Sequence, residues 1–267
     1  MAIRSKHECN LASSPALKMP QEFKDHFSAQ AATYTQFRPH YPADLFDWLA
    51  SVCSKHEHCW DCATGNGQAA HGLADHFAQI SATDASASQI AQAKPHPRVA
   101  YSVATAEASG LDSQCVDLIT VAQAAHWFDH EKFFGEVNRV LRPDGIVALW
   151  AYEIERVTPE IDAIFDELYS EILDGYWPPE RRHIESGYRT IPFPFERIHA
   201  PAFDLSVEWS IEQQLGYYRS WSSTNRYIRE NGSDPILLIE GKLRDAWGDK
   251  SRKVQWPLVL LVGKANS

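Results

Sequence analysis

Short apolar runs alternate with amphipathic stretches through the first 150 residues of the chain. The helix-like stretches place apolar side chains three or four residues apart, and the apolar runs between them have the length of strands. The expected strands lie near residues 59–62, 79–83, 99–103, 116–121 and 146–150. The expected helices cover about 42–52, 68–77, 85–93 and 129–140. Strands that alternate with helices at this pitch predict an α/β fold with a Rossmann-like, doubly wound and mostly parallel sheet.

After residue 150 the pattern loses this regular alternation. Residues 174–200 have little periodicity, although they are rich in Pro and aromatic residues. Capping sequences predict two further helices, because Thr favours the N-cap with Pro in the first turn, and Ser-x-x-Gln resembles a capping box. The further elements expected are a helix from Thr158 to about Leu173, a strand at 203–209, a helix from Ser210 through Trp221, and a final antiparallel strand at 253–263.

This change of pattern predicts one domain with an insertion. Residues 1–20 read as a flexible leader, within which Met19 is an alternative start. We expect residues 21–267 to form a single domain, with a core of about 42–150 and 201–267 and an inserted helical cap of about 151–200. A chain of 267 residues is long enough to bury the core of such a domain.

The composition narrows the function classes. Hydrophobic residues make up 44% of the chain, and the net charge is −10 without a Lys/Arg-rich run. An acidic surface argues against broad binding of nucleic acid or anionic membranes. No apolar stretch approaches the roughly 20 residues of a membrane-spanning helix, and residues 1–19 lack the apolar middle of a secretion signal. We therefore expect a cytoplasmic protein that binds neither nucleic acid nor membranes.

The five cysteines include one C-x-x-C pair, Cys59 and Cys62, which raises the question of a metal or redox site. Positions three apart on a strand face opposite sides of a sheet, so these two thiols should not converge. No second Cys or His pair follows at zinc-finger spacing. We expect free thiols and no bound metal.

The most informative stretch is Trp60-Asp-Cys-Ala-Thr-Gly-Asn-Gly-Gln, followed by a helix, a strand and Asp84. This order is typical of the first half of a nucleotide-binding sheet. Gly65 and Gly67 allow positive φ and let the backbone approach a ligand. Asp84, at the carboxyl end of the second strand, is placed to accept hydrogen bonds from two ribose hydroxyls. Any tight turn from strand to helix favours glycine, so this motif needs support from the rest of the chain.

An aromatic and proline-rich block, YTQFRPHYP, precedes the first predicted helix. It carries Tyr34 and Arg38 between residues that cannot form a continuous helix. An Arg flanked by tyrosines can hold a carboxylate in its planar fork, while a solvated surface turn is the alternative.

Several motifs in this order resemble those of class I S-adenosylmethionine-dependent methyltransferases. They are DCATGNGQ, TDAS followed by QIAQA, AEASGL, VDLITVAQAAHWFD and LRPDGIVALW. The likeness is greatest to the methyltransferase type 11 group, which includes trans-aconitate methyltransferase-like proteins. That group also has a YxxxRPxYP block and a closing WPLVLLVG strand, so the resemblance covers about residues 23–263.

The resemblance implies S-adenosyl-L-methionine as the cofactor. Asp61 would balance the ammonium of its methionine part, directly or through solvent, and Asp84 would accept the ribose hydroxyls. Ala106 and Glu107 would border the adenine, and Gln123 would lie under the sulfonium. The implied cofactor-binding residues are Tyr34, Arg38, Asp61, Gly65, Asn66, Gly67, Asp84, Ala85, Ala106, Glu107 and Gln123. Glu107 could instead be a solvated loop acid, and Gln123 could merely cap a strand.

Two other functions remain open. Gly65-x-Gly67-x-x-Ala70 also fits a looser dinucleotide fingerprint, which would indicate an NAD-dependent oxidoreductase. Asp61 interrupts the apolar strand that such a fold usually keeps, and no hydride-transfer constellation follows. The other alternative is a non-catalytic regulatory protein that binds S-adenosylmethionine.

The acceptor pocket is expected from the insertion and from the helix after Ser210. Its aromatic content suits a small molecule, such as a carboxylic acid methylated on oxygen, better than a macromolecule. A carboxylate nucleophile needs no general base, whereas a hydroxyl or amine would need one, and His126 is the candidate. An aromatic wall is the alternative role for His126. Candidate substrate-binding residues are His126, Trp127, Tyr152, Arg181 and Tyr218, and Arg182 is a further candidate carboxylate holder. The sequence leaves the acceptor and the oligomeric state open.

Overall fold

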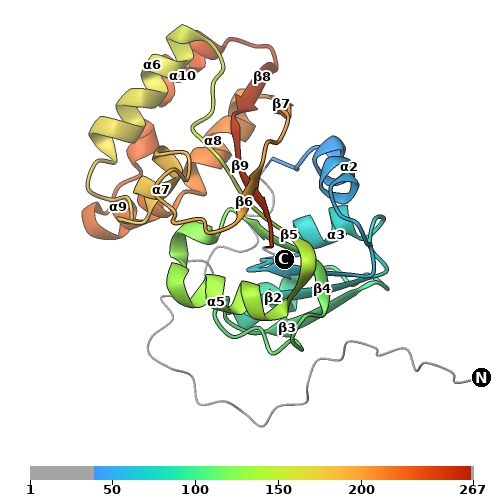
Figure 1. Ribbon diagram of the computed structural model, residues 1–267. Coiled ribbons are helices and arrows are strands. Elements are labelled where there is room, and N and C mark those ends of the chain that lie inside the picture. Colours follow the sequence, from blue (N-terminus) through green and yellow to red (C-terminus); the bar gives the residue numbers. More distant parts are fainter. Residues whose placement is uncertain (1–38, 266–267) are drawn as a thin grey trace, which may run out of the picture.

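The computed structural model describes residues 39–265 of the chain. Within this range, seven strands form one sheet in the order β3-β2-β1-β4-β5-β9-β6 (Figure 1). Their bounds are β1 (His58–Cys62), β2 (Gln79–Asp84), β3 (Val99–Val103), β4 (Val116–Ala122), β5 (Leu141–Tyr152), β6 (Glu196–Ile198) and β9 (Leu258–Lys264). Strands β1 to β5 pair in parallel, whereas β9 is antiparallel to β5 and β6. The predicted Rossmann-like sheet with an antiparallel last strand is confirmed.

The central strand β1 is buried along its whole length because helices cover both faces of the sheet. Cys59 packs in the cluster that includes side chains of α2 (Ala43–Ser51) and α3 (Gln68–Leu73). Cys62 packs in the cluster on the other face, with α5 (His130–Val140). The predicted divergence of the C-x-x-C pair is thus confirmed, and Cys53, Cys59, Cys62 and Cys115 are free thiols.

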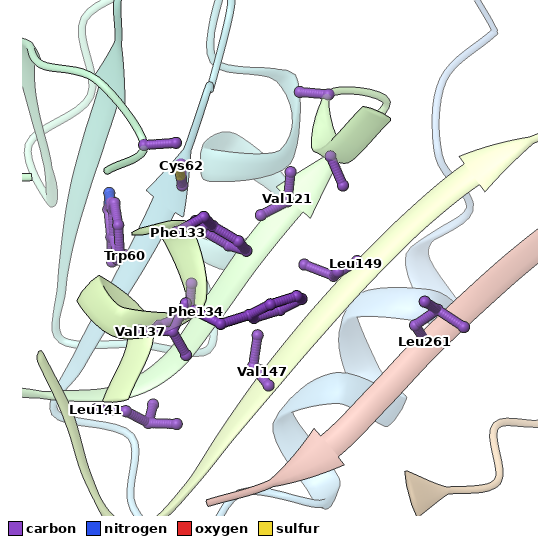
Figure 2. Close-up of a cluster of buried hydrophobic side chains, with 14 of the residues drawn as sticks. Trp60, Cys62, Val121, Phe133, Phe134, Val137, Leu141, Val147, Leu149 and Leu261 are labelled. Atoms are coloured by element: carbon purple, nitrogen blue, oxygen red, sulfur yellow. The ribbon is translucent and has the colours of Figure 1, made fainter. Parts of the chain in front are cut away.

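Helix α5 shows how its sequence pattern positions it against the sheet. Asp129 caps its first turn by accepting a hydrogen bond from the Lys132 N–H, and Phe133 and Val137 face inward. Figure 2 shows these side chains against β1, β4 and β5, with Leu261 of β9 at the edge of the cluster. Burial of such aromatic and aliphatic side chains stabilises the fold by about 1.5–3 kcal/mol each.

Strand β5 begins at Leu141, immediately after α5 ends, and not at residue 146 as expected from the Arg-Pro-Asp-Gly sequence. Asp144 adopts a positive φ of 64°. The pairing with β4 shifts register between Val116 and Leu118, so the irregular residues are accommodated as a bulge within the strand. A turn-like sequence can therefore lie inside a strand when that strand holds the extra residues as a bulge.

A second layer of helices lies over one end of the sheet, and we call it the cap (Figure 1). A two-stranded sheet belongs to it, and its core is one apolar cluster that includes Phe165, Tyr217, Tyr218 and Trp221. The cap elements are α6 (Pro159–Glu167), η3 (Leu168–Ile172), α7 (Arg181–Glu185), β7 (Leu205–Trp209), α8 (Ile211–Arg219), α9 (Ser222–Asn231), η4 (Pro235–Leu238), α10 (Glu240–Trp247) and β8 (Arg252–Trp256). The cap as named here extends beyond the predicted insertion of residues 151–200, because α8 and α10 pack with α6. The division of the chain into a core and an insertion ending near residue 200 stays a prediction.

Two expected elements in this half of the chain are each broken in two. The helix that begins at the Ser210 capping box ends at Arg219, and Trp221 precedes the separate helix α9. The expected strand at 253–263 is divided by Pro257 into β8, which pairs with β7, and β9, which pairs with β5. Proline has no N–H to donate to a ladder, so the chain changes sheets at that residue.

Some predictions fall outside the described residues, namely the leader at 1–20, the residues Tyr34 and Arg38, and the thiol of Cys9. Among the helices of residues 39–265, none has the length and apolar character needed to cross a bilayer. In the same range no three His, Cys, Asp or Glu side chains gather as metal ligands would. Helix α4 (Ala87–Gln92) completes the described elements and packs on β2 and β3.

Candidate functional site

The turn between β1 and α3 is built around two glycines with left-handed backbones. Gly65 has φ 57° and Gly67 has φ 89°, and Gly67 is the N-cap of α3. A Cβ on Gly67 would lie 2.2 Å from the hydroxyl oxygen of Tyr101 on β3. The turn therefore requires glycine at 67 both for its backbone conformation and because Tyr101 covers it.

We expect Gly67→Ala to lower the free energy of unfolding by about 2 kcal/mol, from the left-handed backbone and the contact with Tyr101 together. Gly110→Ala is the matched control, because Gly110 also has a positive φ, of 74°, but has open space where a Cβ would be. Urea denaturation of both variants separates the two contributions. Equal losses of stability would show that Tyr101 does not restrict this turn.

Asp61 lies behind the turn and is fully buried. Its carboxylate accepts hydrogen bonds from the hydroxyls of Thr64, at 2.5 Å, and Thr120, at 2.7 Å. Burial raises the pKa of Asp61 to about 6, while these hydrogen bonds act in the opposite direction. The two carboxylate oxygens thus hold the turn and β4 together. Asp61 would therefore act on a ligand's ammonium as a charge located behind the turn.

Asp84 connects the same turn to the next helix. Its Oδ2 accepts a hydrogen bond from the Gly65 N–H at 2.9 Å, and its Oδ1 accepts one from the Ser86 N–H at 2.8 Å. The carboxylate stands at the carboxyl end of β2, half-buried, with Ala85 beside it. The carboxyl end of the second strand is the position where an acidic residue contacts the ribose in nucleotide-binding sheets of this kind.

The other candidate cofactor residues follow β3 and β4. Ala106 is buried in the turn after β3, and the Glu107 carboxylate accepts a hydrogen bond from the Asp129 N–H at 3.2 Å. Gln123 follows β4 with φ 56°, and its amide nitrogen donates to the Tyr152 carbonyl at 3.4 Å. The sheet order brings the ends of β1, β2 and β4 together, so these turns line the same edge as the glycine turn.

His126 lies in a short turn of 3-10 helix, η2 (Ala125–Trp127), at this edge and is 7% exposed. Its Nδ1 lies 3.3 Å from the Tyr188 hydroxyl, and its ring centroid lies 4.8 Å from that of Trp127. Burial lowers the pKa of His126 to about 3, and the nearby positive charge of Arg181 contributes in the same direction. A histidine in this environment stays neutral at physiological pH.

Arg181, at the start of α7, is held by aromatic side chains. Its guanidinium lies 4.5 Å from the ring centroid of Trp177, and its Nε donates to the Tyr169 hydroxyl at 2.8 Å. Neither terminal nitrogen of this guanidinium has a hydrogen-bond or ion-pair partner among residues 39–265. Arg182, one residue on, is exposed to solvent. The two candidate arginines thus differ in their surroundings, because Arg181 is held by aromatic side chains whereas Arg182 is exposed to solvent.

A cavity of about 250 Å³ adjoins Arg181 where the chain passes from the sheet to the cap. Its lining residues are Glu153, Ile154, Arg156, Arg181, Ile184, Glu185 and Pro257. Tyr152 and Tyr218 do not line this cavity but are buried among aromatic side chains, Tyr152 facing Trp256 and Tyr218 facing Trp221. A second cavity, of about 430 Å³, lies far from the glycine turn, beside the ion pair of Arg142 with Asp117.

Comparison with known proteins identifies the family to which this site belongs. The family described as "Methyltransferase domain" matches residues 60–149, from β1 to the end region of β5. A protein of Dictyostelium discoideum with a provisional methyltransferase name is 35% identical over 254 residues, which cover 92% of this chain and 97% of that protein. The chain belongs to the class I S-adenosylmethionine-dependent methyltransferases.

Two further similarities extend across most of this methyltransferase. A solved structure of a provisionally named type II methyltransferase from Anaeromyxobacter dehalogenans is 44% identical, with a TM-score of 0.81 over 85% of this chain and 98% of that one. An uncharacterized methyltransferase of Mycobacterium tuberculosis is 32% identical over 186 residues, which cover 69% of this chain and 70% of that protein. The likeness therefore includes the cap as well as the sheet.

The sequence analysis did not predict the contacts of four residues, namely Thr120, Tyr101, Glu155 and Gln214. Thr120 had a visible signal, because it is a polar residue in the apolar run of β4, and the register places it opposite Asp61. Tyr101 had no such signal, since its role depends on the pairing of β3 with β2. Glu155 and Gln214 are described below, because their burial is a property of the folded cap.

Proposed function

We propose that this methyltransferase binds S-adenosyl-L-methionine at the glycine turn and transfers the methyl group to a small-molecule carboxylate. The observation that carries the cofactor assignment is Asp84, which stands at the carboxyl end of β2 and holds the Gly65 turn through its carboxylate. The left-handed Gly65, where a Cβ would meet only the Gln89 amide oxygen at 3.9 Å, supports close approach of the ligand to the backbone. When bound, the cofactor would supply a methyl group on a sulfonium, which an in-line nucleophile can attack with the neutral thioether of S-adenosylhomocysteine as the leaving group.

The protein's own part in such a transfer is positioning. Gln123 and Tyr152 are candidates for the floor of the reaction site, because their hydrogen bond joins the ends of β4 and β5. His126 and Trp127 are candidates for its wall. A buried His126 with a pKa of about 3 is a weak proton acceptor at neutral pH, which favours a nucleophile that is already ionised.

Arg181 supports a carboxylate as that nucleophile. Its ring contacts and its hydrogen bond to Tyr169 fix the guanidinium, and its terminal nitrogens are available to hold a planar anion. Its charge lowers the pKa of His126, so the guanidinium lies within electrostatic reach of that candidate wall residue. A carboxylic acid would therefore enter as its anion, oriented by Arg181, and leave as the methyl ester.

The direct test of the cofactor is calorimetric titration of the full chain with S-adenosylhomocysteine and, separately, with NADH. We expect micromolar binding of S-adenosylhomocysteine and none of NADH. Binding of NADH alone would favour the oxidoreductase. Transfer of labelled methyl from S-adenosylmethionine to small carboxylic acids then distinguishes an enzyme from a regulatory binding protein.

Arg181→Met should raise the KM for a carboxylate acceptor about tenfold, because a charge-assisted hydrogen bond contributes about 1.5 kcal/mol. Methionine keeps much of the apolar stem that packs on Trp177. Arg182→Met is the matched control, since Arg182 is exposed, and it should leave KM within about twofold. An equal effect of both substitutions would contradict a specific role for Arg181.

A further inference from the structure

Behind Arg181, the cap buries a group of polar side chains that the proposed reaction does not use. We call it the Glu155 recess, formed by Glu155, Gln214 and Tyr218. Glu155 is 3% exposed, and Gln214 and Tyr218 are 0% exposed. Burying a carboxyl, an amide and a hydroxyl away from water is unfavourable unless each finds hydrogen-bond partners.

These partners are incomplete within the recess. The Gln214 amide nitrogen donates to the Glu155 carboxylate at 3.2 Å. The Tyr218 hydroxyl lies against both side chains, yet it forms no hydrogen bond of good geometry with them, and the Gln214 amide oxygen has no partner either. Within residues 39–265, Glu155 forms no ion pair. Among the described residues the recess therefore has two oxygen atoms without a partner and a carboxyl group without an ion pair.

We propose that the Glu155 recess binds an ammonium group of the methyl acceptor, so that the substrate is an amino acid-like molecule with its carboxylate at Arg181. The two atoms without a partner are the Gln214 amide oxygen, which accepts, and the Tyr218 hydroxyl oxygen, which can accept as well as donate, and an ammonium offers three donors. A ligand cation would also supply the charge that Glu155 lacks. This inference rests on the proposed function, because it assumes that the acceptor carboxylate binds at Arg181.

The position of Glu155 supports a link to the reaction site. It follows Tyr152 by three residues, and the Tyr152 carbonyl accepts the hydrogen bond of Gln123 at the edge of the sheet. The charge of Arg181 lowers the pKa of both Glu155 and His126, so the guanidinium is within electrostatic reach of the recess and of η2. Ile154 and Arg156, the chain neighbours of Glu155, line the cavity beside Arg181, so a ligand held there lies next to the segment that carries Glu155.

The electrostatic state of Glu155 is consistent with an absent cation. Burial raises its pKa to about 7, despite the opposing effects of hydrogen bonds and of Arg181. A bound ammonium would favour the ionised form and restore an ordinary carboxylate. Water molecules are the alternative occupants of the unused hydrogen-bonding positions.

The test compares acids that differ only in an ammonium group. With S-adenosylhomocysteine bound, the full chain is titrated with glycine, β-alanine, 4-aminobutyrate and 5-aminovalerate, and with acetate, propionate, butyrate and valerate. The series varies the distance between the carboxylate and the ammonium. We expect at least one amino acid to bind ten or more times as tightly as its matched acid. Methyl transfer to the same compounds provides a second readout.

Glu155→Gln and Tyr218→Phe test the recess itself. The first removes the charge at constant shape, and we expect it to abolish the preference for the amino acid, while the second should reduce it about threefold. Both should bind S-adenosylhomocysteine as the wild type does. Equal binding of acids and amino acids, binding of neither series, or a preference that survives Glu155→Gln would each overturn the inference and indicate water in the recess.

Failure of the proposed function would look different. In that case the wild type would not bind S-adenosylhomocysteine or would transfer no methyl group to any acid. The two failures are distinguished because cofactor binding is measured on every variant before the acceptors are added.

Discussion

Asp84→Ala should weaken the binding of S-adenosylhomocysteine by about 100-fold, since two hydrogen bonds from ribose hydroxyls to a carboxylate contribute about 3 kcal/mol together. The same substitution removes the acceptor of the Gly65 and Ser86 N–H groups, which loosens the glycine turn that the ligand contacts. Both effects weaken the binding of S-adenosylhomocysteine, and calorimetric titration measures the loss of affinity.

Two variants control for the change of charge and of shape. Asp112→Ala removes an exposed carboxylate with the same effect on net charge, and it should leave the affinity unchanged. Asp84→Asn keeps the shape and one acceptor oxygen, and we expect an intermediate loss of about tenfold. An Asp84→Ala protein that is folded and binds within threefold of the wild type would exclude Asp84 as a ribose ligand.

Glu155→Gln should make the protein more stable at pH 8 by up to about 3 kcal/mol, and it should not do so at pH 4.5. The pKa of Glu155 is raised from 4.5 to about 7 in the folded protein. The folded state therefore binds this proton more strongly than the unfolded state does. The stability that the neutral carboxyl provides is fully present below pH 4.5 and is lost as the pH rises through about 7.

Urea denaturation of both proteins at pH 4.5, 6 and 8 measures this difference. Other buried acids, such as Asp61, contribute to both proteins and cancel in the comparison. Glu160→Gln, on the exposed first turn of α6, is the matched control and should change stability little at any of these pH values. A stability difference between wild type and Glu155→Gln that is independent of pH would show that Glu155 is not held neutral by burial.

Local chemistry explains what could be predicted from the sequence. The glycines at 65 and 67, the acid at 84 and the caps at Asp129, Thr158 and Ser210 act through neighbours only a few residues away or through the order of strands. The types of the elements from α2 to β5 and the edge of the sheet at which the candidate cofactor residues lie could therefore be predicted, whereas α7, β6, η4 and α10 were not expected.

The remaining features depend on contacts between distant residues. Pro257 lies in a continuous apolar run, and only the presence of β7 on one side and β5 on the other shows why the strand divides there. Glu155 and Gln214 are separated by 59 residues. Nothing in the local sequence of either residue indicates that the cap encloses both, so the recess could not be predicted.

The break at Pro257 also has a mechanical consequence. The chain leaves the sheet at the end of β5, returns briefly for β6, and returns for the last time at the start of β9. The first and the last of these passages are hydrogen-bonded to each other. The Glu153 N–H donates to the Pro257 carbonyl at 2.8 Å, and Arg156 and Gln255 bond reciprocally through their backbones. One attachment of the cap is thus a paired ribbon, and a tilt of the cap at this attachment has to bend both strands together. Because Tyr152 ends one of those strands, such a tilt would pull directly on the backbone carbonyl that holds Gln123.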